Sequence, residues 1–224
     1  MPAAPILETK TAGMAAVNSI DFVRRTFSLF ADGVTAATFR SDADRTRLQG
    51  FGVTDFATPS EEKGWARLRF TPDDGDAIAQ ILFTSGTTGE PKAIALSRGA
   101  ISNTIRRLNA VMAVDGGIRE YVGVPVTYSF GLARVRAASA AGGEFFLPQN
   151  GFAPSEIAQM LKRRDINAVS AVPTLWRILM QNADLFGPER AALRWIEIGS
   201  QLMTRAEKEA LKGLFPNAVI VQHY

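Results

Sequence analysis

The feature that most constrains the fold is an alternation of short β-rich runs and helical patterns over roughly the last hundred residues. The runs that fit strands lie at residues 120–125, 144–147, 167–172, 193–197 and 218–222. The helical patterns between them lie near 130–141, from Pro154 onward, over 174–183 and over 204–214. Thr204, followed three residues later by Glu207, predicts a capping box at the start of the last helix. Strands separated by helices predict an α/β fold, with a mostly parallel sheet covered by helices on both faces.

The first 115 residues are less regular. Asn18 is a candidate N-cap for a helix whose apolar residues share one face, namely Ile20, Val23, Phe27 and Phe30. A strand is possible at 34–39, and the charge, Gly and Pro of residues 41–64 predict exposed loops. We therefore expect a first, partial and reduced subdomain over 1–115 and a second α/β subdomain over 116–224.

Composition excludes several classes of function. The 224-residue chain has no cysteine, so it can form no disulfide, thiolate nucleophile or zinc–thiolate site. It shows neither a signal-peptide pattern nor a run of about 18 apolar residues, and we expect a cytoplasmic protein without a membrane span. The formal net charge is only +3, and the arginine pairs 24–25, 106–107 and 163–164 each fall in a predicted helix, where a solvated face explains them. Nucleic acid is not an expected partner.

The stretch 84-TSGTTGEPKA-93 is the strongest local signal. Its glycines let backbone N–H groups converge, its hydroxyls add donors, and Lys92 adds a positive charge, which together describe an oxyanion cradle. Strand candidates at 77–83 and 93–97 flank it, and a helix begins after Ser97. A Walker loop requires Gly-Lys-Ser/Thr leading directly into a helix, so a P-loop NTPase is not expected. A simple hairpin turn with a surface lysine stays open as the alternative.

The stretch 76-DAIAQILFTSGTTGEPKAIALS-97 resembles the phosphate-binding signature of the adenylate-forming superfamily, which includes acyl-CoA synthetases, luciferases and peptide-synthetase adenylation domains. Further segments resemble later family motifs in the same order: 125-PVTYSFGL-132, 142-GGEFFLP-148, 169-VSAVPTLWRIL-179, 198-IGSQLM-203 and 221-VQHY-224. The resemblance covers roughly residues 76–224. It implies the two-subdomain α/β fold of the superfamily's N-terminal domain.

The resemblance also implies a reaction in which a carboxylate attacks the α-phosphate of ATP and pyrophosphate leaves. Backbone and hydroxyl donors suit the departing phosphates, with Lys92 as the catalytic cation. The implied phosphate-binding residues are Thr84, Ser85, Gly86, Thr87, Thr88, Gly89 and Lys92. The implied adenine pocket consists of Gly199, Ser200 and Gln201, with Tyr224 stacked on the base. The glutamate that binds Mg²⁺ in the family is expected beyond Tyr224.

Three positions bear on how closely the family pattern holds. Ala93 stands where the family usually has Gly, which predicts altered loop mobility with binding retained. Tyr128 stands where amino-acid activators place aspartate, so we expect the substrate to be a carboxylic acid without an α-amino group. Tyr128 would then form a wall of the substrate pocket. The alternative is that Tyr128 is an ordinary half-buried tyrosine. The lone histidine, His223, is interpreted as a strand-end residue and not as a catalytic base.

These observations predict the N-terminal portion of an ATP-dependent carboxylic-acid adenylating enzyme, either an acyl- or an aryl-CoA ligase. Because the chain stops before the family's Gly-x-Thr-Glu motif, we expect a fragment that lacks full activity by itself. The expected partners are a small carboxylic acid, ATP, and CoA or a carrier protein. Two alternatives stay open: an enzyme that loads a carrier protein, and a non-catalytic binding or scaffold protein derived from the family.

Overall fold

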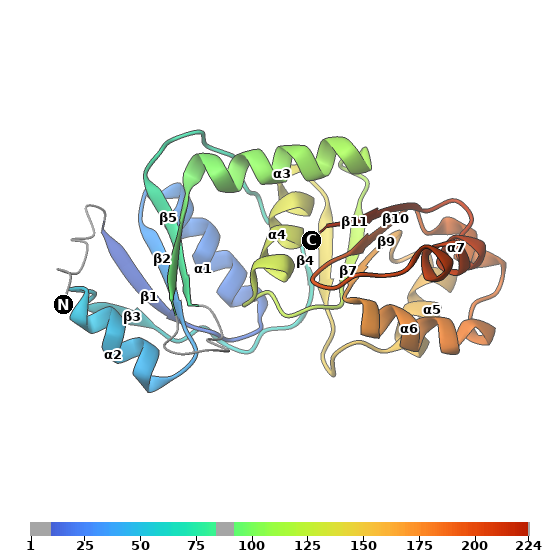
Figure 1. Ribbon diagram of the computed structural model, residues 1–224, viewed down its shortest axis with the longest axis horizontal. Helices are drawn as coiled ribbons and strands as arrows, with labels where there is room; N and C mark the ends of the chain where they lie inside the picture. The colour runs from blue at the N-terminus through green and yellow to red at the C-terminus, as the bar shows by residue number, and fades with distance from the viewer. Residues whose placement is uncertain (1–9, 84–91, 224) are drawn as a thin grey trace. The chain divides into compact units, whose positions relative to one another are not determined.

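The computed structural model describes residues 10–83 and 92–223. The chain divides into two compact units: unit 1 comprises residues 1–62 and 70–104, and unit 2 comprises residues 63–69 and 105–224. The division falls inside helix α3 (Arg98–Met112), the long helix in Figure 1. Each unit has its own sheet, so each is described by itself.

Unit 1 contains a sheet with the strand order β3-β1-β2-β5-β6 in its described part. These strands are β1 (Thr11–Ala15), β2 (Thr35–Phe39), β3 (Asp55–Ala57), β5 (Ile78–Phe83) and β6 (Ala93–Ser97). All neighbours are parallel except β5 and β6, which are antiparallel. Helix α1 (Ile20–Ala31) buries the predicted apolar face, including Ile20, Val23, Phe27 and Phe30. Strand β5 precedes the phosphate-loop segment and strand β6 follows it, so this segment joins strand to strand, as predicted.

Two expectations for unit 1 were wrong. The N-cap of α1 is Ser19 and not Asn18: the helix begins one residue later than predicted, and the Ser19 hydroxyl accepts a hydrogen bond from Phe22 N at 3.1 Å. Residues 41–64 are not all loop, because they contain helix α2 (Asp42–Gly50) and strand β3. Helix α2 is highly charged, but its buried Leu48 packs in a cluster with Ala37, Val53 and Ile81. Tertiary packing of one leucine thus supports a helix that periodicity does not predict.

Unit 2 contains the predicted parallel sheet, with the order β11-β10-β9-β7-β8-β4 in its described part. Its strands are β4 (Gly64–Ala66), β7 (Arg119–Val122), β8 (Glu144–Leu147), β9 (Ala168–Ala171), β10 (Trp195–Ile198) and β11 (Val219–Gln222). Only the β4–β8 pair is antiparallel. The helices between the strands are α4 (Ser129–Ala140), α5 (Pro154–Lys162), α6 (Pro173–Gln181) and α7 (Arg205–Leu214), with 3₁₀ turns at Ala183–Leu185 and Pro188–Ala192. The expected α/β class, with mostly parallel sheets flanked by helices, is confirmed.

The helix ends of unit 2 follow local sequence signals in most places. Thr204 and Glu207 form the predicted capping box. Proline occupies the first turn of α5 and of α6, where its missing N–H costs no hydrogen bond. The pair Arg163–Arg164 differs from the expectation, because α5 ends at Lys162, Arg163 is its C-cap, and Arg164 has a left-handed backbone with φ 60°. These two arginines therefore lie in the turn after the helix.

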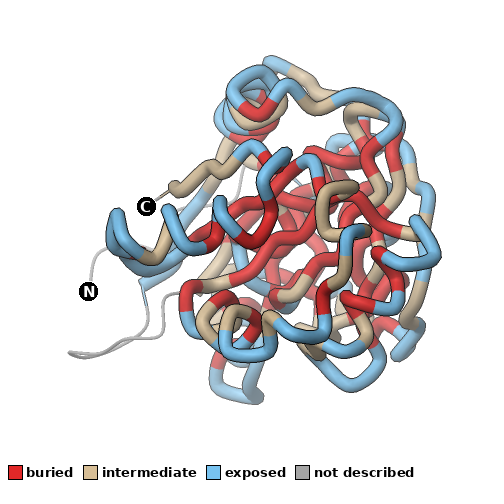
Figure 2. The backbone as a smooth tube through the Cα atoms, turned by 90° about the vertical axis from the view of Figure 1, so that its right-hand side faces the viewer, coloured by how far each residue is buried: buried red, intermediate tan, exposed pale blue. Residues whose placement is uncertain are grey.

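The core of unit 2 is an apolar cluster between the sheet and its helices that includes Tyr121, Trp176, Ile196 and Phe215. Figure 2 shows the buried segments in the interior, enclosed by exposed helices and turns. Helix α4 packs against β7 and β8 and is buried along most of its length. It also buries two arginines, Arg134 and Arg136. Buried arginines are uncommon, and the first of them has a defined pair of partners described below.

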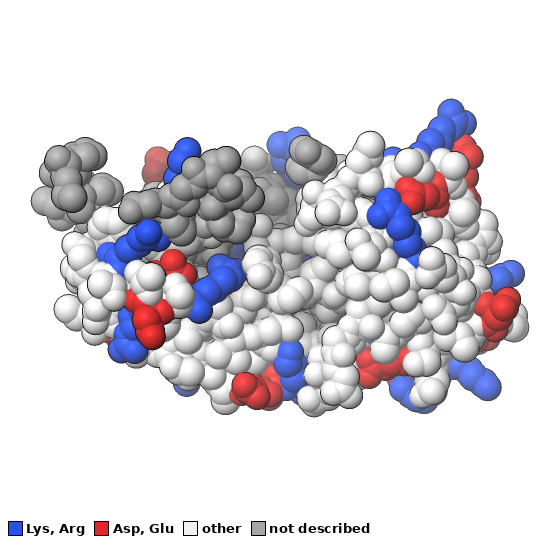
Figure 3. Space-filling model, turned by 60° about the horizontal axis from the view of Figure 1, so that its bottom comes forward, with Lys and Arg blue, Asp and Glu red and all other residues white. Residues whose placement is uncertain are grey.

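Several charged side chains at the surface are in local ion pairs. Arg24 lies 3.0 Å from Glu62, and Arg205 lies 2.7 Å from Glu209. Figure 3 shows basic and acidic side chains interspersed over the face that it displays. Within the described ranges, none of the helices has the length and apolar character that crossing a membrane requires.

Candidate functional site

The candidate site in unit 2 lies at the carboxyl end of its parallel strands, where α/β sheets commonly bind ligands. Strand β10 is fully buried and ends at Ile198, after which Gly199 is buried and Ser200 and Gln201 are exposed. Ser200 has a left-handed backbone with φ 77°, so the chain turns sharply as it leaves the sheet. The Gln222 amide donates to Gln201 O at 2.7 Å. The predicted segment 199–201 is thus an exposed turn tied to the end of β11.

Gly199 has no room for a side chain. A Cβ atom there would lie 2.7 Å from Phe130 Cε1 and 2.8 Å from His223 Cε1. The rings of Phe130 and His223 meet edge to face with centroids 4.8 Å apart. Their contact with Gly199 brings the start of α4, the end of β10 and the end of β11 together. The family-like motifs 125–132, 198–203 and 221–224 therefore converge in their described parts.

Tyr128 is the N-cap residue of α4, with an extended backbone and 56% of its surface exposed. Its N–H donates to Pro125 O at 3.2 Å, and its carbonyl accepts from Leu132 N at 3.0 Å. A Cβ atom on Gly131 would lie 2.3 Å from Pro125 O, so the motif 125–132 folds back tightly on itself as the helix begins. Tyr128 is therefore held at the carboxyl edge of the sheet with an accessible side chain.

A buried charge network lies beneath this edge. The Arg134 Nε and Nη2 atoms donate to the Glu120 carboxylate at 2.8 Å each, and Arg134 Nη1 contacts Glu197 Oε2. The side chains of Arg134, Glu120 and Glu197 are each only 1% exposed. Glu197 Oε1 also lies 2.8 Å from His223 Nδ1, in a contact that lacks hydrogen-bond alignment. The network connects β7, α4 and β10 to the residue that follows β11.

The sheet register explains why these charges meet. Glu120 is opposite Ala168 on β9, and Glu197 is opposite Ser170. Ala168 and Ser170 are two residues apart and share one face of the sheet, so both glutamates project toward the same side. Burial by itself lowers the pKa of Arg134, but the attraction of Glu120 and Glu197 more than reverses this and holds the pKa above its ordinary value.

The phosphate-loop residues Thr84, Ser85, Gly86, Thr87, Thr88 and Gly89 lie outside the described residues, as does Tyr224. The flanks of the loop are described: Phe83 of β5 is opposite Ala93 of β6, and exposed Lys92 directly precedes β6. Ala93 therefore sits in a strand, where alanine is tolerated. Lys92 belongs to unit 1, whereas Tyr128 and residues 199–201 belong to unit 2.

Sequence reasoning missed Phe130 and the buried network. His223 does follow the last strand, but it also contacts Glu197 and Phe130. One signal was available: a glutamate inside the apolar run 193–197 is unusual in a buried strand and calls for a cationic partner. Which cation supplies that partner cannot be read from spacing. Among the described residues, no group of three or more His, Asp or Glu side chains could hold a metal ion.

The profile of the AMP-binding enzyme family matches residues 26–224 of the chain. The chain belongs to the AMP-binding enzyme family. The resemblance carried by the motifs from residue 76 onward is thereby confirmed.

Individual relatives cover only parts of the chain or resemble it in fold. Pyochelin synthetase PchF of Pseudomonas aeruginosa is 33% identical over 107 residues, which are 47% of this chain and 6% of that protein. The nonribosomal peptide synthetase FmoA3 has a similar structure, with a TM-score of 0.75 and 15% identity, over 96% of this chain and 26% of that one. A malonyl-CoA ligase with methylmalonyl-CoA and AMP bound gives a TM-score of 0.74 and 19% identity, over 95% of this chain and 51% of that one. At these identities the two structures show a shared fold.

Proposed function

We propose that this chain is the N-terminal part of an ATP-dependent enzyme that joins a carboxylic acid to AMP. The observation that carries the proposal is the family match over residues 26–224. The convergence of segments 125–132, 198–203 and 221–223 at one sheet edge supports it, because ligands of α/β sheets bind at the carboxyl ends of strands. The chain spans 6% of the pyochelin synthetase, so the activity of the whole protein is part of the proposal.

The residues present fit a nucleotide. The exposed turn at Ser200 and Gln201 offers accessible backbone and side-chain polar groups for a base. Lys92, at the end of the phosphate loop, supplies a cation for phosphates whose negative charge grows as pyrophosphate leaves. We assign the hydroxyls and N–H groups of residues 84–89 to the same task. Mg²⁺, when bound, would neutralise phosphate charge.

For the acid, we propose a substrate without an α-amino group, activated by an acyl- or aryl-CoA ligase. Tyr128 has an accessible side chain at the carboxyl edge, and its phenol cannot neutralise an α-ammonium group. Nearby Glu197 is fully buried and already engaged by Arg134, so it offers no free carboxylate. The fold shared with a malonyl-CoA ligase is compatible with CoA as the acceptor.

A second candidate is an enzyme that passes its acyl group to a carrier protein. The 33% identity with a pyochelin synthetase and the fold shared with a nonribosomal peptide synthetase favour it. The two candidates share the adenylation step and differ in the thiol that accepts the acyl group.

The test is carboxylate-dependent exchange of labelled pyrophosphate into ATP by the parent protein, with a panel of acids and matching α-amino acids. We expect exchange with at least one acid, and a preference of more than roughly a hundredfold over its α-amino counterpart. Addition of CoA or of a phosphopantetheinyl carrier protein then separates the two candidates. Absence of exchange with every acid would favour a non-catalytic scaffold, and a best substrate with an α-amino group would refute the role given to Tyr128.

A further inference from the structure

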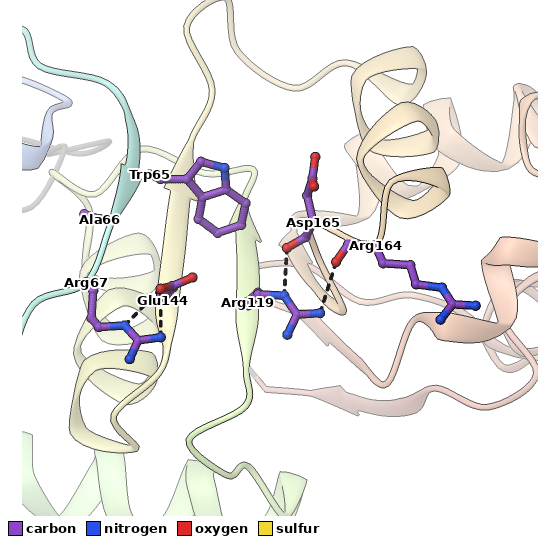
Figure 4. Close-up of a pocket in the computed structure, with 7 residues that line it drawn as sticks. All are labelled: Trp65, Ala66, Arg67, Arg119, Glu144, Arg164 and Asp165. Atoms are coloured by element: carbon purple, nitrogen blue, oxygen red, sulfur yellow. Dashed lines mark hydrogen bonds and ion pairs between the residues drawn. The ribbon is translucent and has the colours of Figure 1, made fainter.

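The opposite edge of the unit 2 sheet, where β7 and β8 begin, carries two adjoining pockets that the proposed reaction does not use. The first has a volume of about 490 Å³ and is lined by Trp65, Ala66, Arg67, Arg119, Glu144, Arg164 and Asp165 (Figure 4). The second has a volume of about 600 Å³ and shares Arg119 and Arg164 with the first. Both are depressions that open widely to solvent.

Four of the eight charged residues that line the pockets are in ion pairs with other described residues. Arg67 binds Glu144 at 2.8 Å, as Figure 4 shows. Asp165 is bound by Arg163 at 2.7 Å, and Arg194 lies 3.0 Å from Asp115. Neither Arg119 nor Arg164 has an ion pair with a carboxylate in the described part of the chain. These two guanidinium groups therefore leave an uncompensated positive charge where the pockets adjoin.

Arg119 is held rigidly by backbone carbonyls. Its Nε donates to Asp165 O at 2.9 Å and its Nη2 to Arg164 O at 3.1 Å, as the dashed lines in Figure 4 show. A longer contact of 3.5 Å joins Nη1 to Gly117 O. A guanidinium group has five N–H donors, so two remain for a ligand. Because Arg119 is already ordered, an anion that binds it loses little side-chain entropy.

Arg164 is exposed, and its side chain has no hydrogen-bond acceptor among the described residues. Its left-handed backbone, with φ 60°, is costly for an arginine, and Gly or Asn would adopt it more easily. The turn thus keeps a charged residue at a position that favours a small one. Figure 4 shows the Arg164 side chain extending away from Arg119, and because it has no partner in the described ranges its guanidinium can turn toward a ligand bound in the pockets that both arginines line.

Trp65 supplies an aromatic surface in the first pocket. Its ring packs on Phe146 with centroids 5.4 Å apart, and the residue is still 41% exposed. Trp176 is fully buried and Trp195 is 2% exposed, so Trp65 is the accessible tryptophan of the three in the chain. A fixed, half-covered indole beside free guanidinium donors can hold a flat ring that carries an oxyanion.

We propose that these pockets form a binding site for a small phosphate ester with a flat ring, with the phosphate on Arg119 and Arg164 and the ring against Trp65. The site is separate from the proposed adenylation site, because it lies at the amino-terminal edge of the sheet. It requires only residues of unit 2. It can therefore be tested on this chain, whatever the activity of the parent protein.

The test uses phenyl phosphate as the probe, with tryptophan fluorescence and calorimetry as readouts on the 224-residue chain. We expect a saturable fluorescence change that Trp65→Phe abolishes. In calorimetry, Arg164→Asn should weaken binding by about tenfold or more, because one charge-assisted contact is lost. Asn suits the left-handed backbone at this position, so this variant is expected to fold. Arg119→Gln should have a similar effect, with circular dichroism to confirm its fold.

Arg205→Gln is the matched control. It also removes one arginine charge, from a side chain on α7 that is 92% exposed, and it should leave the affinity for phenyl phosphate unchanged. Phenol and inorganic phosphate separate the two halves of the ligand, and each should bind more weakly than phenyl phosphate. The proposal is overturned if phenyl phosphate does not bind, or if Arg164→Asn leaves its affinity unchanged. It is also overturned if Arg205→Gln weakens the binding of phenyl phosphate as much as Arg164→Asn does, or if phenol or inorganic phosphate alone binds as tightly as phenyl phosphate.

Discussion

Replacing Arg134 by methionine tests the buried charge network most directly. Arg134 is 1% exposed and is the cation between Glu120 and Glu197, each also 1% exposed. Methionine has a long, flexible side chain that can occupy the space of the arginine stem but carries no charge. The variant leaves two buried carboxylates without their cation, and His223 contacts only Glu197.

The expected cost is large. Removing one partner of a buried ion pair typically costs about 3–5 kcal/mol, because an uncompensated charge stays buried. That is a substantial fraction of the roughly 5–15 kcal/mol that stabilises a typical domain. We therefore expect Arg134→Met to shift the urea midpoint of unit 2 strongly downward. The buried Trp176 and Trp195 of unit 2 report this transition by fluorescence, with Trp65→Phe as the background.

The matched control is the variant Glu120→Gln/Arg134→Met/Glu197→Gln, in which no charge of the triad remains. If uncompensated charge causes the loss, this variant should be more stable than Arg134→Met despite carrying more substitutions. The reasoning is refuted if Arg134→Met unfolds at the wild-type urea concentration. It is equally refuted if the neutral triple variant is no more stable than the single one.

Three further predictions concern other residues. Arg177 and the Thr204 cap lower the pKa of Glu207 to about 2, so the stability that Glu207 contributes is present above the ordinary carboxyl pKa near 4.5 and is lost as the pH falls toward 2. In urea titrations at several pH values, Arg177→Gln should reduce this loss of stability at low pH. An unchanged dependence of stability on pH would contradict the assignment. Gly199→Ala should lower the free energy of unfolding by about 1–3 kcal/mol because its Cβ meets Phe130 and His223, and a wild-type melting curve would show that these rings move freely. In the parent protein, Lys92→Ala should lower kcat/KM for ATP roughly ten- to a hundredfold while acid binding changes less, and an unchanged kcat/KM would refute its role at the phosphates.

Local sequence signals were sufficient for much of the architecture. The strands and helices from residue 119 onward follow from alternating periodicity, and the capping box at Thr204 follows from two side chains three residues apart. Family membership was also readable, since glycines, hydroxyls and a lysine recur at set spacings in segment 84–93. Signals of this kind depend on residues that are close together along the chain, so they can be read from the sequence without the tertiary structure.

Other features depended on packing between distant segments. Helix α2 forms because Leu48 finds partners on β2 and β5 and in the loop at Val53, and no pattern within residues 42–50 reveals them. The helix start at Ser19 instead of Asn18 was decided by which side chain reaches the free N–H of Phe22. Such choices are small differences in free energy that local propensity cannot resolve.

The two edges of the unit 2 sheet that carry the proposed sites also combine features set by the sequence with features set by the tertiary structure. The sequence by itself determined which residues follow each strand, because strand order along the chain sets what lies at the carboxyl ends of β10 and β11. Only the tertiary structure decided that Glu120, Arg134 and Glu197 meet, since the strand order β7-β9-β10 and its register place two glutamates under one helix. The pairing of Trp65 with Arg119 in one pocket likewise required β4 to add to the edge of the sheet beside β8. A charge in a sequence predicts that a buried partner is needed, but the geometry of the sheet selects which residue it is.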